Sequence, residues 1–205
     1  MNALCERMWL NRVRRRQILY VEGNRATHFY AVRSGKVKLV RIIGGGREHV
    51  TAILEAGDLF GFEAVFDDSY SSDAVTLTDA ELCLVSGAEL SELTVEVPRL
   101  MTDIARYLSF QLCRTRHRQA WLTASSASAK LAGYLLQGLR SHGAPDDDST
   151  VAGDLTLRDL AGILGMAPET VCRARRDLAE RGIIETLPSG VRVRDQESLR
   201  RVAGH

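Results

Sequence analysis

The sequence has no long apolar run. None of its apolar stretches approaches the about 20 residues that a membrane-spanning helix needs, and residues 1–16 lack the apolar centre of a secretion signal. A membrane-spanning protein is therefore excluded, and nothing directs export. We expect a cytoplasmic protein without a membrane partner.

Cysteine is scarce and scattered, with single residues at Cys5, Cys83, Cys113 and Cys172 and no CxxC pair. Metal sites usually have short spacings between their ligands, so neither a zinc site nor an iron–sulfur site is indicated. The sequence also lacks a nucleophile–base constellation and a Walker-type glycine loop. We therefore expect neither an enzyme nor a metal or other resident cofactor.

The chain as a whole has no large excess of either charge, since its net charge is only +1, but the charges are unevenly distributed. Residues 1–97 contain 11 Lys and Arg against 14 Asp and Glu, whereas residues 98–205 contain 16 against 12. The second half is thus the better partner for phosphates. With 205 residues, 45% of them hydrophobic and 26% charged, the chain suits two modest globular domains.

Short apolar runs broken by turn residues fill residues 18–85. Residues 36–42 alternate as a half-buried strand does, Gly44–Gly46 form a turn, and residues 49–54, 74–77 and 82–85 are further strands. This pattern predicts a small antiparallel barrel or sandwich. Ser86 is a candidate cap for a short helix that follows.

After Pro98 the pattern becomes helical to about Trp121. One face of this predicted helix is apolar, and we expect it to form a dimer seam, the alternative being simple packing on the barrel. The seam residues are Leu100, Ile104, Leu108 and Leu112. Small residues at 124–128 predict a hinge or cap before another helix at 129–140, and residues 141–150 predict a polar loop.

Residues 156–194 predict a winged helix-turn-helix. An apolar stripe at helical spacing ends at Gly165, which can adopt the left-handed turn that terminates a helix, and Pro168 suits the first turn of the next one. This second helix places one apolar face opposite a polar one. The apolar face is Val171, Ala174 and Leu178, and the polar face is Glu169, Thr170, Arg173 and Arg176. Two strands around Pro188–Gly190 predict the wing.

A barrel, a long helix and a winged helix-turn-helix, in this order, resemble the cyclic-AMP receptor protein and fumarate–nitrate regulator superfamily of bacterial transcription factors. Three motifs carry the resemblance. They are the GxxAxxxYxVxxGxV signature at 23–37, the AGDxxG turn at 56–61, and the ETVxR core at 169–173. The resemblance implies an α+β fold with a cyclic-nucleotide-binding-like β-roll of the jelly-roll type (1–97), a dimerisation helix (98–124) and a DNA-binding domain (125–205).

By this resemblance, Glu169 and Arg173 read base edges. They are four residues apart and so share a helix face, and a carboxylate can accept from cytosine while Arg can donate twice to guanine. The remaining base-reading candidates are Thr170, Pro168 and Cys172. Relatives that read TGTGA have an arginine directly before this glutamate, and Pro168 instead implies a TTGA-like half-site in a palindrome. Candidate phosphate contacts are Thr156, Arg158, Arg176, Ser189 and Arg192.

The sensory half departs from the family pattern. Cyclic-nucleotide binders clamp the phosphate with an Arg-Ser/Thr-Ala segment, but Ser72 stands at the arginine position and Asp73 adds a negative charge. We therefore expect Gly61, Glu63, Ser72 and Asp73 to be a vestigial effector pocket. Haem, with His28 and His49 as conceivable ligands, a different small effector, and no effector at all remain alternatives.

The resemblance implies a homodimeric, sequence-specific regulator of double-stranded DNA, most often an activator that touches RNA polymerase. The polymerase contact would lie in residues 143–150, with the acidic run Asp146–Asp148. The alternative is a small-molecule-sensing module, for a cyclic nucleotide or haem, whose DNA binding depends on the ligand.

Overall fold

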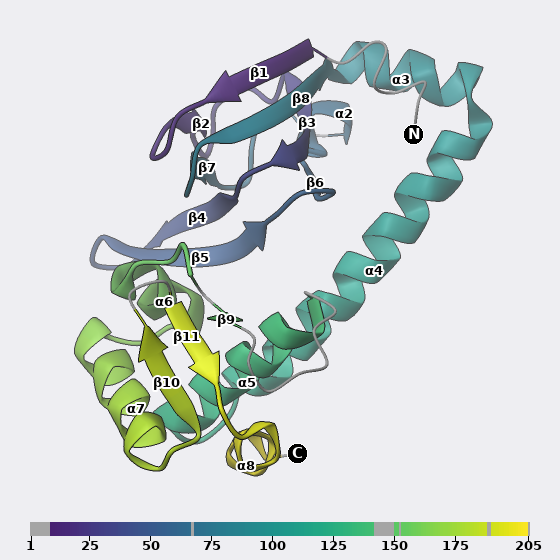
Figure 1. The fold of residues 1–205 in the computed structure, drawn as a ribbon. Helices are drawn as coiled ribbons and strands as arrows, with labels where there is room; N and C mark the ends of the chain where they lie inside the picture. Colours follow the sequence, from purple (N-terminus) through teal and green to yellow (C-terminus); the bar gives the residue numbers. More distant parts are fainter. Residues whose placement is uncertain (1–8, 67, 142–149, 152, 188–189, 205) are drawn as a thin grey trace. The chain divides into compact units, whose positions relative to one another are not determined.

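The computed structural model describes residues 9–66, 68–141, 150–151, 153–187 and 190–204 (Figure 1). Its internal contacts divide the chain into two units, Met1–Ser109 and Phe110–His205. The division falls inside one helix, α4 (Pro98–Leu122), which is the long helix expected from the sequence. Among the described helices, none is long and apolar enough to cross a membrane.

The first unit is built from two antiparallel four-stranded sheets, as the short alternating runs predict. One sheet has the strand order β1-β8-β3-β6 and the other β2-β7-β4-β5. Their strands are β1 (Trp9–Val13), β2 (Ile18–Tyr20), β3 (His28–Ser34), β4 (Val37–Ile43), β5 (Arg47–Leu54), β6 (Leu59–Phe60), β7 (Asp73–Thr76) and β8 (Ala80–Ser86). The predicted glycine turn joins β4 to β5, which pair from Val37 with Leu54 to Ile43 with Arg47.

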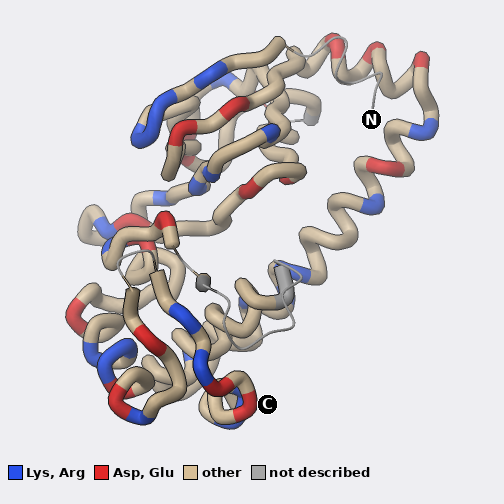
Figure 2. Tube along the Cα trace, viewed as in Figure 1, with Lys and Arg blue, Asp and Glu red and all other residues tan. Residues whose placement is uncertain are grey.

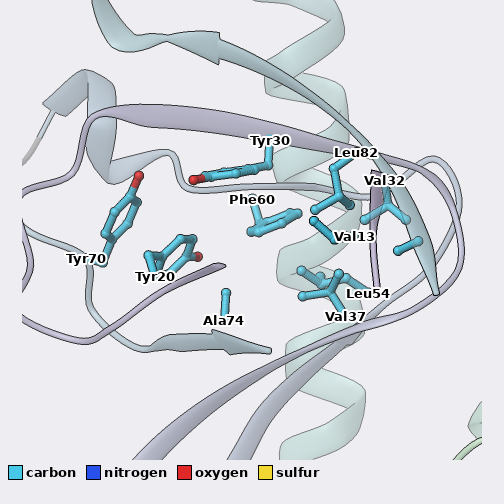
Figure 3. Packing of buried hydrophobic residues seen from close by; sticks show 11 residues of the cluster. Val13, Tyr20, Tyr30, Val32, Val37, Leu54, Phe60, Tyr70, Ala74 and Leu82 are labelled. Atoms are coloured by element: carbon cyan, nitrogen blue, oxygen red, sulfur yellow. The ribbon is translucent and has the colours of Figure 1, made fainter. Parts of the chain in front are cut away.

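Side chains from both sheets meet in one core (Figure 3). Successive residues of a strand point to opposite faces, so Tyr30 and Val32 of β3 enter this core whereas Phe29 points away from it. The core consists of Val13, Tyr20, Tyr30, Val32, Val37, Leu54, Phe60, Tyr70, Ala74, Ala80 and Leu82. The two sheets are therefore the layers of a β-roll, with α2 (Glu63–Phe66) between β6 and β7 in the chain.

The outer face of the β3–β8 sheet is covered by helices. Ser86 caps α3 (Gly87–Glu96) as predicted, through a capping box with Glu89. Leu90 and Leu93 of α3 and Leu100 of α4 pack on Phe29 and Val85, with Ile104 at the edge of the cluster.

This cluster corrects part of the predicted dimer seam. Leu100 is only 8% exposed and belongs to the protomer's own core, and Ile104 packs against it, because α4 begins directly on the sheet unit. Leu108 and Leu112, in contrast, remain 43% and 52% exposed in the single chain. Between Arg106 and Arg114 the helix carries no charged residue (Figure 2).

The second unit continues from α4 into α5 (Ala127–Ser141), α6 (Leu157–Leu164) and α7 (Pro168–Glu180). The predicted small-residue cap before α5 is confirmed, since the Ser126 hydroxyl accepts from the Ala129 amide at 3.0 Å. A three-stranded antiparallel sheet follows, with the order β10-β11-β9. Its strands are β9 (Thr150–Val151), β10 (Ile184–Leu187) and β11 (Gly190–Val193).

The last helix is among the elements that were not expected from the sequence. Helix α8 (Gln196–Ala203) closes the described chain, with Asp195 as its N-cap and Leu199 fully buried. Its sequence contains few apolar residues, and the single buried leucine gives too weak a periodic signal to predict a helix.

Candidate nucleic-acid interface

Helix α6 begins with a capping box. The Thr156 hydroxyl accepts from the Asp159 amide at 3.1 Å, and the Thr156 amide donates to the Asp159 carboxylate at 3.0 Å. The same hydroxyl donates to that carboxylate at 2.6 Å. Thr156, predicted to contact phosphate, is therefore the N-cap of α6, and its hydroxyl is already used as donor and acceptor.

Gly165 ends α6 in the left-handed conformation that the sequence predicts, with φ 64° and ψ 34°. The Gly165 and Met166 amides both return to the Ala161 carbonyl, which closes the turn. Pro168 then occupies the first turn of α7, where its fixed φ and its missing N–H cost nothing. The helix-turn-helix is thus confirmed as a local structure.

Helix α7 has the two faces that were predicted. Val171, Ala174 and Leu178 are buried against the rest of the second unit. Glu169, Arg173 and Arg176, spaced at four and three residues, are exposed on one face, and Thr170, Pro168 and Cys172 are half-buried beside it. Along this helix three arginines, at 173, 175 and 176, lie between Glu169 and the acidic residues Asp177 and Glu180 (Figure 2).

Glu169 and Arg173 do not form the intrahelical ion pair that their spacing allows. The Arg173 guanidinium lies 3.4 Å from the Thr170 hydroxyl instead. Within the described part of the chain, the Glu169 carboxylate has no hydrogen-bond or ion-pair partner. The Glu169 carboxylate can therefore accept a new hydrogen bond without breaking a contact among the described residues, and Arg173 would give up only its long contact with Thr170.

The other predicted phosphate contacts have different surroundings. Arg158 is exposed at the start of α6, as Arg176 is on α7. Arg192 lies in β11 and pairs with Glu185 of β10 at 3.3 Å, and Arg194 pairs with the same carboxylate at 2.6 Å. A phosphate would compete with Glu185 for Arg192. Ser189, like the run Asp146–Asp148 and Cys5, lies outside the described residues.

Two contacts that hold the helix-turn-helix were missed in the sequence. The Arg118 guanidinium of α4 donates to the Ile163 carbonyl in the last turn of α6 at 3.2 Å. The Ser128 hydroxyl of α5 donates to the Asp177 carboxylate of α7 at 2.7 Å. Their partners lie 45 and 49 residues away along the chain, and no local pattern indicates such pairs.

The four residues of the expected effector pocket are either hydrogen-bonded to neighbouring residues or closely packed. Asp73 accepts from the Glu22 amide at 2.7 Å, and Glu63 accepts from both the amide and the hydroxyl of Ser71. Ser72 is buried. A Cβ at Gly61 would lie 2.8 Å from the His28 carbonyl, and its φ of +77° also favours glycine.

Aromatic rings fill the core beside these residues (Figure 3). Tyr20 stacks on Tyr70 with ring centroids 3.7 Å apart, and Tyr30 stacks on Phe60 at 4.8 Å. Burial, followed by the charge of Glu63, raises the pKa of Tyr20 far above its ordinary value. The interior next to Glu63 is thus occupied by packed aromatic rings.

A β-roll, a long helix and a winged helix-turn-helix with an exposed Glu–Arg face together define a DNA-binding regulator. Sequence models of two families match the chain, the cyclic nucleotide-binding domain at residues 10–96 and the Crp-like helix-turn-helix domain at residues 129–202. The chain belongs to the cyclic-AMP receptor protein and fumarate–nitrate regulator superfamily of transcription regulators.

Curated relatives agree with this membership, and a solved structure shares the fold. The CRP-like cAMP-activated global transcriptional regulator of Mycobacterium tuberculosis is 30% identical over 187 residues, which cover 90% of this chain and 84% of the relative. The anaerobic regulatory protein of Pasteurella multocida is 25% identical over 193 residues, 94% of this chain and 71% of the relative. The structure of FixK2 from Bradyrhizobium japonicum has the same fold, with a TM-score of 0.81, 23% identity, and coverage of 95% and 96% of the two chains.

Proposed function

We propose that this regulator binds, as a homodimer, a palindromic DNA site with TTGA-like half-sites, that it does so without cyclic AMP, and that it activates transcription. The observation that carries the proposal is the exposed face of α7, on which Glu169 lacks a partner among the described residues and Arg173 contacts only a neighbouring hydroxyl.

The chemistry of the two side chains matches the one G·C pair of TTGA. Arg173 can donate twice to the guanine O6 and N7 atoms, and Glu169 can accept from the amino group of the paired cytosine. The half-sites would lie about one helical turn apart, on the same face of the duplex. Arg158 and Arg176 are exposed and would contact phosphates, which fixes the register of the protein on DNA.

Dimerisation is supported by the uncharged middle of α4. Leu108 and Leu112 lie four residues apart, on one helix face, and both are exposed in the single chain. Exposed leucines repeated along a helix are typical of a helix–helix interface. A two-fold dimer of this kind would present two copies of α7, which a palindromic site requires.

Independence from cyclic AMP is supported by the sensory half. A cyclic phosphate needs a cation or a group of backbone donors, but Ser72 stands where relatives have arginine, and Asp73 and Glu63 would repel the anion. The ring cluster of Tyr20, Tyr70 and Phe60 also fills the adjacent interior. The M. tuberculosis relative is named as cAMP-activated, so the ligand-dependent alternative is the competing function.

Direct binding measurements separate the two functions. Ligand-free protein should bind a duplex carrying the TTGA inverted repeat more tightly than one in which the G·C pair of each half-site is replaced by A·T. Each half-site change should cost about 1–3 kcal/mol of binding free energy. The double variant Glu169→Gln with Arg173→Met should bind both duplexes equally, because it lacks the two readers.

The same titration is then repeated in the presence of cyclic AMP and in the presence of haem. Neither should change the affinity for the inverted repeat. Specific binding that appears only after one of them is added would establish the ligand-dependent alternative, and equal binding of both duplexes by the unmodified protein would refute the proposed site.

A further inference from the structure

The last turns of α4 contact the helix-turn-helix through a partly buried cation. Arg118 donates from its guanidinium to the carbonyl of Ile163, 3.2 Å away. Ile163 is one residue before the end of α6, and the carbonyls of a last helical turn lack partners within the helix. Arg118 therefore acts as a C-terminal cap that comes from another helix.

A guanidinium suits this position for two reasons. The C-terminal end of a helix carries partial negative charge, which a cation stabilises, and a planar guanidinium retains its charge even when it is partly desolvated. Burial lowers the pKa of Arg118, whereas the nearby Tyr134 side chain of α5 acts in the opposite direction.

The position of Arg118 is fixed by its own helix. Trp121, three residues further along α4 and so on the same face, is buried and donates from its indole to the Gln137 side chain of α5 at 2.8 Å. Gly133 of α5 lies so close that a Cβ there would be 2.4 Å from the Trp121 Cβ. Trp121 of α4 is thus packed directly on α5.

Helix α5, on which Trp121 packs, also holds the C-terminal half of α7. The Ser128 hydroxyl, in the first turn of α5, donates to Asp177, and Asp177 also pairs with Arg181 at 3.6 Å. Arg118 thus contacts the helix-turn-helix just before its turn, and Ser128 contacts α7 near the C-terminal end of that helix. Between them lie Glu169 and Arg173.

We propose that Arg118 is a positioning residue for DNA reading. Its hydrogen bond to Ile163 fixes the end of α6, hence the Gly165 turn and the direction in which α7 presents its base-reading face. The inference rests on the proposed reading of bases by Glu169 and Arg173. Base-edge hydrogen bonds depend on orientation, whereas phosphate contacts through flexible side chains depend on it much less.

The test measures a ratio. Dissociation constants are determined for the unmodified protein and for Arg118→Met on the TTGA inverted repeat and on the duplex with the replaced G·C pairs. The specificity ratio is the constant for the replaced duplex divided by the constant for the TTGA repeat. We expect the ratio to fall about tenfold, because a charged hydrogen bond at the turn is lost, while binding to the second duplex stays within about twofold, as expected where phosphate contacts dominate.

Two further variants make the result specific. Arg118→Lys should restore most of the ratio, since an ammonium can also donate to the Ile163 carbonyl. Arg116→Met is the matched control, because Arg116 lies on the same helix, is exposed and has no partner among the described residues. It should leave the ratio unchanged. Amide hydrogen exchange at Gly165 and Met166 should be faster in Arg118→Met than in Arg116→Met.

The outcomes are distinguishable. An unchanged ratio in Arg118→Met, with a specific unmodified protein, overturns the positioning role and leaves the proposed function standing. Equal losses on both duplexes also overturn it, since they indicate general destabilisation. If Arg118→Met does not fold, Arg118→Gln is measured instead, and an unchanged ratio there has the same meaning. An unmodified protein without sequence preference refutes the proposed function itself.

Discussion

Removing the hydroxyl of Tyr70 should destabilise the β-sheet unit, whereas removing that of Tyr20 should not. The two rings are stacked on each other, and both are buried, at 3% and 7% exposure. Tyr70→Phe and Tyr20→Phe therefore delete the same atom from neighbouring rings and leave the same apolar packing. Any difference between them reports hydrogen bonding.

The Tyr70 hydroxyl has three partners on the backbone. It accepts from the Thr27 amide at 3.3 Å and the His28 amide at 3.1 Å, and it donates to the His28 carbonyl at 3.0 Å. For the Tyr20 hydroxyl there is no hydrogen-bond partner in the described part of the chain.

The expected loss follows from these partners. Each hydrogen bond contributes about 0.5–1.5 kcal/mol net, and an orphaned buried group costs more. Thr27 and His28 are themselves exposed, so water can replace part of what is lost. We expect Tyr70→Phe to lower the free energy of unfolding of this unit by about 2 kcal/mol, and Tyr20→Phe to change it by less than about 0.5 kcal/mol.

The measurement must resolve the two units, because a chain with two units need not unfold in one step. Urea unfolding followed by pulsed hydrogen exchange, with peptides covering β3 and α5 read separately, meets this need. Tyr70→Phe should shift the transition of β3 and not that of α5. Equal effects of the two substitutions, or a larger effect of Tyr20→Phe, would refute the reasoning from hydrogen bonds.

Two further predictions concern the second unit. Gly133→Ala should lower its free energy of unfolding by about 1–3 kcal/mol, because the new methyl overlaps Trp121; an unchanged urea midpoint for α5 would contradict this packing. Thr156→Val should cost about 1 kcal/mol through the lost N-cap of α6. If Thr156 is only a cap, the affinity of Thr156→Val for DNA should depend on salt concentration as that of the unmodified protein does. A shallower dependence would instead indicate that Thr156 contacts a phosphate.

The local features of the DNA-binding domain were predictable from sequence. Gly165, Pro168 and the apolar spacing of α7 each determine backbone geometry within a few residues, and the structure has the turn and the exposed face that they indicate. The capping role of Ser86 and the turn at Gly44–Gly46 are of the same kind. Turn and cap chemistry acts over three or four residues, so one sequence suffices.

Only the tertiary structure decided which residues of an apolar helix face pack inside the protomer and which stay exposed. The sequence predicted an apolar face on α4 but gave no means of dividing it. Packing placed Leu100 in the protomer's core and left Leu108 and Leu112 exposed. Periodicity shows that a helix has an apolar side, and only the position of the neighbouring sheet shows which part of that side is already covered.

What the sequence by itself determined is therefore the family, the order of the elements and the residues that α7 presents. What only the tertiary structure decided is how those residues are held. Arg118 meets Ile163, Ser128 meets Asp177, and Tyr70 stacks on Tyr20. These partners are 45 to 50 residues apart in the chain. Hydrogen bonds and ring stacking depend on position in space, and spacing along the chain carries no record of such pairs.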